Sequence, residues 1–167
     1  MIEFEENVKY GYGVRKSIVF YFYDMLDSKK IEVIENIIET FIEQFQVKFN
    51  KKMVINEDRY RNIRGGWQKL FHRVFDDGDF AHHAHILDLL EVEEEQLPTH
   101  RAYMLLWVDY YLPSSIIFQC TQQTDWKQIY HFMEYVNEQI EVHFASAGYP
   151  LKKLKSGIDS TGEKAYY

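Results

Sequence analysis

Cysteine is almost absent from this sequence, which contains a single one, Cys120, among 167 residues. The chain therefore forms no internal disulfide, as is usual for proteins of a reducing compartment. The N-terminal stretch MIEFEENVKY lacks the basic region followed by an apolar run that marks a secretory signal peptide. No apolar run approaches the ~18 residues that a membrane-spanning helix needs. Together these absences predict a cytoplasmic protein with no membrane partner.

Positive charge is also scarce. The chain has 19 Lys and Arg residues against 26 Asp and Glu residues, and its formal net charge is −7. This balance argues against a nucleic-acid partner, because nucleic-acid-binding proteins use positive charge to displace counterions from phosphates. An acidic chain is instead suited to a basic protein partner.

Hydrophobic and aromatic residues are plentiful, at 46% and 17% of the chain, which is enough for a sizeable core. The length predicts one domain, which we place at residues 1–150. Residues 151–167 carry several lysines among glycines and serines, and we expect a loosely ordered basic tail there. The 13 tyrosines suggest amphipathic surface as well as core, because a tyrosine can bury its ring while its hydroxyl stays in water.

Recognisable catalytic motifs are missing. The segment Gly11-Tyr12-Gly13 lacks the rest of a dinucleotide-binding fingerprint, and no phosphate-binding loop is present. Cys120 falls on the apolar face of a predicted strand, which indicates a buried, inert thiol rather than a nucleophile. The sequence therefore predicts no cofactor and no catalytic set.

One histidine cluster leaves an enzymatic alternative open. In a strand, His83 and His85 would point the same way and could share a zinc ion. The spacing matches no established zinc signature, so ordinary surface histidines are the simpler interpretation. The alternative is a small metal-dependent hydrolase, whose ligands would come from His82, His83 and His85 with His72, Asp76 or Asp79.

Acidic residues gather in two predicted turns. A hairpin loop between two strands would protrude, and its carboxylates would repel one another. We therefore expect the loop to be fully solvated. Such a loop is either a solubilising tip or a surface that meets a basic cleft on a partner. The predicted partner-binding residues are Glu91, Glu93, Glu94 and Glu95 of this loop, with Asp76, Asp77 and Asp79 of the preceding turn.

Strand patterns dominate the middle of the chain and its beginning. Residues 101–111 are apolar on both faces, which predicts a strand inside a sheet. A turn at Pro113 leads to a second strand ending at Cys120, which we expect to pair antiparallel with the first. Residues 84–90 predict another strand. The stretch SIVFYFY is the strongest strand signal, and we expect residues 14–23 to form a hairpin with residues 2–10.

Helical spacing marks two long segments. One stripe runs from Ile31 to Phe49, and another runs from Trp126 to Phe144, capped by Thr124 and ended by Gly148. A further helical pattern lies near Trp67 and either starts at or breaks at the preceding glycines. The predicted fold is α+β, a two-layer sandwich in which two long helices pack on a mostly antiparallel sheet of four to six strands.

Three short features carry a family resemblance. Val14-Arg15 opens the first strong strand, Tyr110-Tyr111 ends a Tyr-rich strand in mid-chain, and Ala147-Gly148-Tyr149 closes the last segment. In this order the chain resembles a family of bacterial type VI secretion immunity proteins, over residues 14–160. The resemblance implies a cytoplasmic, non-enzymatic protein that neutralises a cognate secreted toxin by binding it.

A third interpretation is a phage or plasmid structural module, which the lack of catalytic chemistry allows. Such a module would assemble obligately, whereas an immunity protein would bind its toxin as a monomer or a homodimer. The sequence alone leaves the oligomeric state open.

Overall fold

The computed structural model describes residues 12–22, 28–54, 60–75, 84–92, 101–109, 112–149 and 151–153. Within these ranges the chain is an α+β protein with three helices and nine strands. In chain order the elements are β1 (Tyr12–Val14), β2 (Lys16–Phe22), α1 (Ser28–Phe45), β3 (Lys51–Val54), β4 (Arg61–Asn62), α2 (Trp67–Phe75), β5 (His85–Glu91), β6 (Ala102–Val108), β7 (Ser114–Cys120), α3 (Trp126–Gln139), β8 (Phe144–Gly148) and β9 (Leu151–Lys153).

A seven-stranded antiparallel sheet forms one layer, in the order β4-β3-β5-β6-β7-β2-β8. The sheet is therefore larger than the four to six strands predicted, because the short strands β3, β4 and β8 extend both of its sides. Strand β6 lies in the middle of the order, as its two apolar faces predicted, and it pairs antiparallel with β7. A separate two-stranded sheet joins β1 to β9, so the first residues of the predicted tail pair with Tyr12–Val14.

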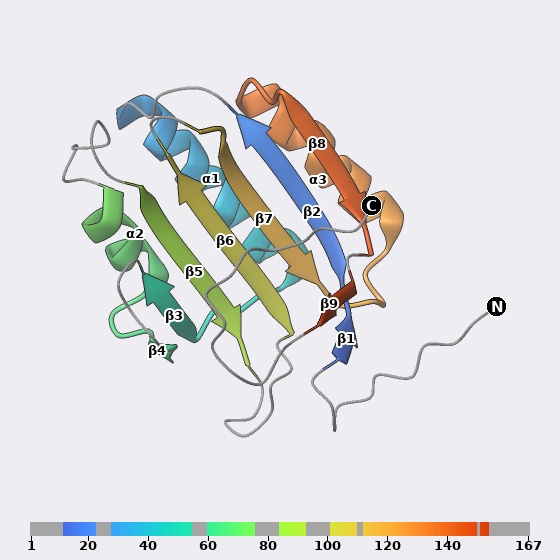
Figure 1. The fold of residues 1–167 in the computed structure, drawn as a ribbon, viewed down its shortest axis with the longest axis horizontal. Coiled ribbons are helices and arrows are strands. Elements are labelled where there is room, and N and C mark those ends of the chain that lie inside the picture. Colours follow the sequence, from blue (N-terminus) through green and yellow to red (C-terminus); the bar gives the residue numbers. More distant parts are fainter. Residues whose placement is uncertain are drawn as a thin grey trace.

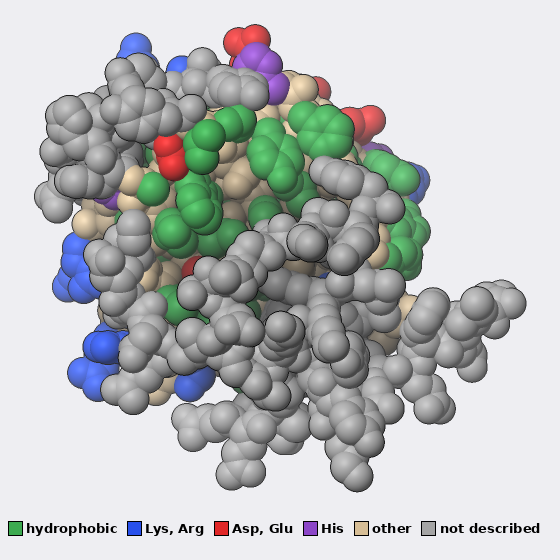
Figure 2. Space-filling model, in the orientation of Figure 1, with side chains coloured by type: hydrophobic (Ala, Val, Ile, Leu, Met, Phe, Trp, Pro, Cys, Tyr) green, Lys and Arg blue, Asp and Glu red, His purple; other side chains and the backbone are tan. Residues whose placement is uncertain are grey.

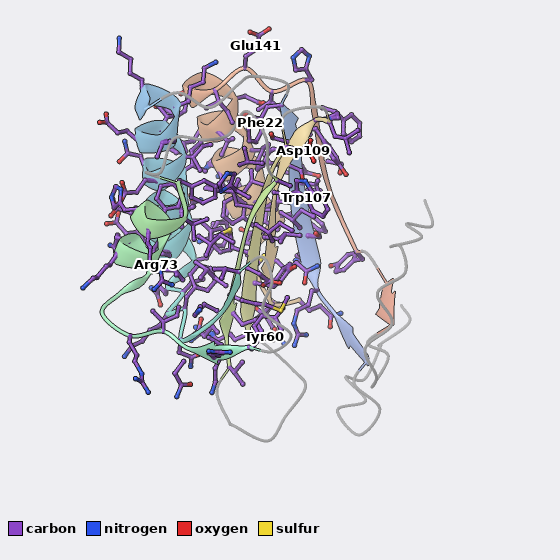
Figure 3. The ribbon with its side chains drawn as sticks, turned by 60° about the vertical axis from the view of Figure 1, so that its left-hand side comes forward. Phe22, Tyr60, Arg73, Trp107, Asp109 and Glu141 are labelled. Atoms are coloured by element: carbon purple, nitrogen blue, oxygen red, sulfur yellow. The ribbon has the colours of Figure 1, made fainter. Side chains whose placement is uncertain are left out.

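The three helices form the second layer and lie on the same face of the seven-stranded sheet (Figure 1). Figure 3 views the molecule from the side, with the helices on one side of the strands and the labelled Trp107 on the other. The strand residues that point toward the helices are almost entirely apolar and fully buried. They include Ile18, Phe20, Leu87, Leu89, Met104, Leu106, Ile116 and Phe118.

Phe41 of α1 is the centre of the aromatic core. Its ring centroid lies 4.4 Å from that of Phe118 on β7 and 5.6 Å from that of Phe132 on α3. Phe132 in turn meets Phe20 of β2 edge to face at 6.3 Å. Through the rings of Phe41 and Phe132 these contacts join α1, α3 and two strands, and Phe41 belongs to the apolar stripe predicted from Ile31 onward.

Strand β2 does not have the partner that was predicted for it in a hairpin of residues 2–10 with 14–23. Strand β2 pairs with β7 on one side and with β8 on the other. Residues 2–10 lie outside the described residues. Since β2 is apolar on both faces, an interior place between two strands buries it better than a terminal hairpin would.

The helix predicted to end at Gly148 ends instead at Gln139. Ile140 has an extended backbone, with φ −134° and ψ 153°, and its N–H still bonds to the carbonyl of Val136. The chain then turns back, so Phe144 belongs to strand β8 and not to the helical stripe. The N-cap is also one residue later than predicted: the carboxylate of Asp125 accepts from the N–H of Lys127.

The helix near Trp67 starts at that residue, immediately after two glycines. Gly65 and Gly66 have φ values of 80° and 92°. Residues with a Cβ rarely adopt this left-handed region, so the two glycines set the direction in which α2 enters the helical layer. Of the two sequence alternatives, the helix beginning after the glycines is the one observed.

Replacing Phe41 with Ala should lower the free energy of unfolding by about 3–5 kcal/mol, because the large cavity would lie among well-packed rings. Denaturant melts measure the change. Leu112→Ala is the matched control, since Leu112 is exposed and its truncation should cost less than about 0.5 kcal/mol. A loss below about 1 kcal/mol for Phe41→Ala would contradict the central position of this ring.

Candidate functional site

The face of the seven-stranded sheet opposite the helices is the candidate site, and we call it the second face. Residues alternate across each strand, so the odd-numbered residues of β2, β6 and β7 and the even-numbered residues of β5 and β8 point to this side. Its members are Ser17, Val19, Tyr21, Ile86, Asp88, Leu90, Tyr103, Leu105, Trp107, Ser115, Ile117, Gln119, Phe144 and Ser146. Figure 2 shows hydrophobic side chains gathered in front of β5, β6, β7 and β2, with acidic side chains at the margins.

Trp107 is the most unusual residue of the second face. It stands on the central strand β6, yet 39% of the residue is exposed. Its indole Nε1 donates to the carboxylate of Asp109 at 3.4 Å, and the N–H of Leu112 donates to the other oxygen of that carboxylate at 3.2 Å. The structure thus presents a large apolar ring and a negative charge side by side at the end of β6 (Figure 3).

A second exposed aromatic stands at the sheet margin. Phe144 of β8 lies opposite Tyr21 of β2, with ring centroids 6.0 Å apart. Ser115 of β7 lies directly between Trp107 and this pair, and the half-buried side chains of Ile117 and Val19 lie in the neighbouring row beside Leu105. The two rows together form a mainly apolar patch over β6, β7, β2 and β8, in which Ser115 and Ser146 are the polar members.

A buried carboxylate lies on the other side of Trp107. Asp88 of β5 is almost fully buried, and its Oδ2 accepts a 2.7 Å hydrogen bond from the hydroxyl of Tyr60. The hydroxyl of Tyr103 reaches the same oxygen at 3.4 Å. Burial, followed by the negative charge of Asp88 and the hydrogen bond to it, raises the pKa of Tyr60 far above its ordinary value of 10.0. Tyr60 therefore stays protonated and acts as a donor.

The predicted acidic surface is only partly described. Glu91 was expected in an exposed loop, but it is the last residue of β5 and only 7% exposed. Its carboxylate lies 3.3 Å from Nη1 of Arg101 and accepts from the N–H of Lys48 at 3.0 Å. This expectation was wrong because the strand extends one residue further than predicted and the carboxylate holds the hairpin ends together. The remaining predicted residues, Glu93, Glu94, Glu95, Asp76, Asp77 and Asp79, lie outside the described residues.

The predicted histidine cluster is also only partly described. His82 and His83 lie outside the described residues, whereas His85 begins β5 and its half-buried ring packs 6.1 Å from Phe75 on the helix side. His72, considered as a further ligand, lies 3.2 Å from the carboxylate of Glu35 on α1. Among the described residues no group of three or more His, Cys, Asp or Glu side chains could hold a metal ion.

Cys120 is buried at the end of β7, as its apolar face predicted, and its Sγ contacts the carbonyl of Lys16 at 3.6 Å. Burial raises the pKa of the Cys120 thiol, while a hydrogen bond to Thr124 and the charge of Lys16 act weakly in the other direction. The Lys16 ammonium donates to the carbonyl of Thr124 and lies 4.7 Å from the ring centroid of Trp126. This cluster ties β2 to the start of α3 and gives no activated nucleophile.

Sequence patterns missed the main features of the second face. Strand β6 is apolar on both sides, and this pattern predicts burial without revealing that Trp107 remains exposed. The signal for Asp88 was present, because it is the one charged residue in the apolar run Ile86–Leu90. A charge in such a run indicates a buried, hydrogen-bonded carboxylate, and two tyrosines provide its partners.

No protein-family model, no curated protein and no solved structure significantly matches this chain. In the part of the chain that the structure describes, no helix has the length and apolarity to cross a membrane. The evidence on function therefore comes from the surfaces described above.

Tyr60→Phe should destabilise the protein by about 1–3 kcal/mol near neutral pH, because it removes a donor from a buried carboxylate. The raised pKa of Tyr60 means that above pH ~10 the unfolded chain releases a proton that the folded chain retains, so this contribution to stability falls as pH rises. Melts at increasing pH should show the gap between wild type and Tyr60→Phe narrowing above pH ~10. Tyr130→Phe, on the helix layer, is the control, and a gap that stays constant contradicts the assignment.

Proposed function

We propose that this chain is a non-enzymatic immunity protein that neutralises a basic protein toxin by binding it through the second face of the sheet. The single observation that carries the proposal is the exposure of Trp107 on the central strand. The family resemblance over residues 14–160 supports the class of partner, and the geometry of the described residues supports the surface.

Trp107 has the properties of a binding anchor. Tryptophan is enriched among the few interface residues that supply most of the binding free energy, and such residues lie near the centre of an interface. The half-buried Leu105 and Ile117 surround it with apolar side chains that can exclude water from the contact. An exposed indole on a soluble protein costs hydration free energy that is recovered when a partner covers it.

The charge near Trp107 selects a basic partner. The carboxylate of Asp109 lies beside the indole, and the whole chain carries a net charge of −7. An arginine or lysine of the toxin can place its charge over the indole ring and against this carboxylate at once. A negative field also speeds the encounter with a positively charged protein.

The second face is also rigid. Strand β6 is paired along most of its length with β5 and β7, and the helices pack on its other side. The anchor therefore loses little conformational freedom when it binds, which favours tight inhibition.

Trp107→Ala should weaken binding to the toxin encoded beside this gene by about 2 kcal/mol, which is roughly thirtyfold in Kd. Calorimetric titration measures this change, and protection of cells that express the toxin should decline with it. Tyr130→Ala, which removes an exposed ring from the helix layer, is the matched control and should bind like wild type. Equal losses in both variants, or a neighbouring gene product that does not bind at all, would count against the proposal.

The acidic loop remains a separate prediction. If it meets the basic toxin at the rim of the interface, replacing Glu93, Glu94 and Glu95 with Gln should slow association at low salt and flatten its salt dependence. The melting temperature should stay almost unchanged, because the effect is on the encounter and not on the fold. Stopped-flow association at several ionic strengths measures it. Wild-type association rates at low salt would show that the loop is only a solvated tip.

A further inference from the structure

Among the described strands, β8 forms one edge of the seven-stranded sheet and has β2 as its single partner (Figure 1). Every second residue of an edge strand turns its N–H and C=O groups away from the sheet, where another strand can bond to them. Proteins usually protect such edges with charges, prolines or bulges. The sequence of β8, FASAG, contains neither charge nor proline, and its register with β2 is continuous.

Exposed aromatic side chains surround this edge. Tyr130, Phe144 and Tyr149 are exposed by 57%, 49% and 47%, and they make up half of the exposed large hydrophobic residues among those described. Phe144 is the first residue of β8, and Tyr149 is the residue immediately after the strand. In Figure 2 hydrophobic side chains also gather at the right-hand margin, where β8 and the start of α3 lie in Figure 1.

Tyr130 belongs to the same margin. The side-chain amide of Gln128 donates to the carbonyl of Gln44 on α1, and the side-chain amide of Gln44 donates to the carbonyl of Gln128, so this flank of α3 faces α1. Two residues later the helix has turned by about 200°, so Tyr130 points away from α1. Its ring centroid lies 6.2 Å from that of Trp126, which in turn lies 5.4 Å from that of Tyr149 next to the end of β8.

We propose that β8 pairs antiparallel with β8 of a second copy of this chain, with Ser146 on the two-fold axis. This register places Phe144 of each copy opposite Gly148 of the other on the second face. A phenylalanine ring covers the bare backbone of a cross-strand glycine well, and such pairs are used to support glycines in sheets. On the helix side the small residues Ala145 and Ala147 oppose each other, so the two helical layers can approach.

Charge complementarity also favours a second copy. The exposed residue Lys127 lies in the first turn of α3, and the exposed Glu134 and Glu138 lie toward its other end. A two-fold axis through Ser146 makes the two copies of α3 antiparallel, so Lys127 of one copy, which lies beside the exposed N-cap Asp125, runs toward Glu134 and Glu138 of the other. Two seven-stranded sheets then become one continuous sheet of fourteen strands.

This inference does not rest on the proposed toxin binding. Trp107 stands on β6, three strands away from β8 in the sheet order. A dimer therefore leaves the anchor of the second face uncovered, and the two surfaces can be tested separately on the isolated protein.

Light scattering coupled to size-exclusion chromatography tests the assembly of the full chain. The wild type should show a species of twice the chain mass of 20.2 kDa, which dissociates on dilution. Ser146→Lys places two like charges opposite each other on the axis and should weaken self-association by at least about tenfold. Ser115→Lys adds the same charge to the same face within the sheet, on β7, and should leave the dimer intact.

A cysteine on the axis gives an independent measurement. Directly opposite residues of an antiparallel pair have Cβ atoms ~4.5–5.5 Å apart, close to disulfide distance. Ser146→Cys should therefore form a disulfide-linked dimer under mild oxidation, while Ser115→Cys should not. The native Cys120 is buried and does not interfere.

Three results would overturn the proposal. The first is a wild-type chain that stays monomeric at every concentration. In that case only a strand of another protein could pair with β8. The second is a dimer that Ser146→Lys does not weaken, which would place the interface elsewhere. The third is Ser146→Cys that crosslinks no better than Ser115→Cys, and this result decides the matter even if the lysine variant fails to fold.

Discussion

The packing of Phe41 against Phe118 and Phe132 is the contact on which the other features depend. These rings join α1 to the sheet and to α3 from one side. Because all three helices follow α1 onto that side, every strand must divide its residues between a helix-covered face and a second face. The helix-covered face is filled by fully buried apolar side chains. On the second face Ser17, Asp88, Tyr103 and Gln119 are also buried, whereas Trp107 and Phe144 stay exposed, so only part of this face is available for binding.

The second face and its margin carry two carboxylates in different environments, Asp88 and Asp109. Asp88 is buried under a hydrogen bond from Tyr60, so its charge is stabilised within the chain. Asp109 holds its carboxylate beside the exposed indole of Trp107, at the end of the central strand. A buried carboxylate needs internal donors, whereas a carboxylate at a rim adds to the field that a basic partner meets. The same residue type thus lies under internal donors in one position and, in the proposed function, takes part in recognition in the other.

The periodicity of hydrophobic residues predicted the elements that bury one continuous apolar stripe. It did not predict where the chain reverses direction. Residues 101–111 and the stripe from Ile31 are long and regular, so β6 and α1 were both predicted, although α1 ends at Phe45 and Phe49 lies beyond it. The stripe from Trp126 continued to Phe144 in spacing alone, although Ile140 already has an extended backbone. Glu91 looked like a loop residue because its neighbours are acidic, but pairing with Arg101 makes it part of the sheet. Such tertiary contacts leave no periodic signal in the sequence.

The early end of α3 determines which strand forms the sheet edge. Had the helix continued to Gly148, as its spacing suggested, β2 would be the edge strand, and its sequence KSIVFYF is long, apolar and β-branched. An edge of that kind is a strong template for aggregation. By turning at Ile140 the chain covers β2 with the small residues of β8, which are far less prone to open-ended association. The edge that β8 forms on this side of the sheet is short, uncharged and flanked by exposed rings. These properties suit the closed, two-fold contact that we propose better than an extended fibre.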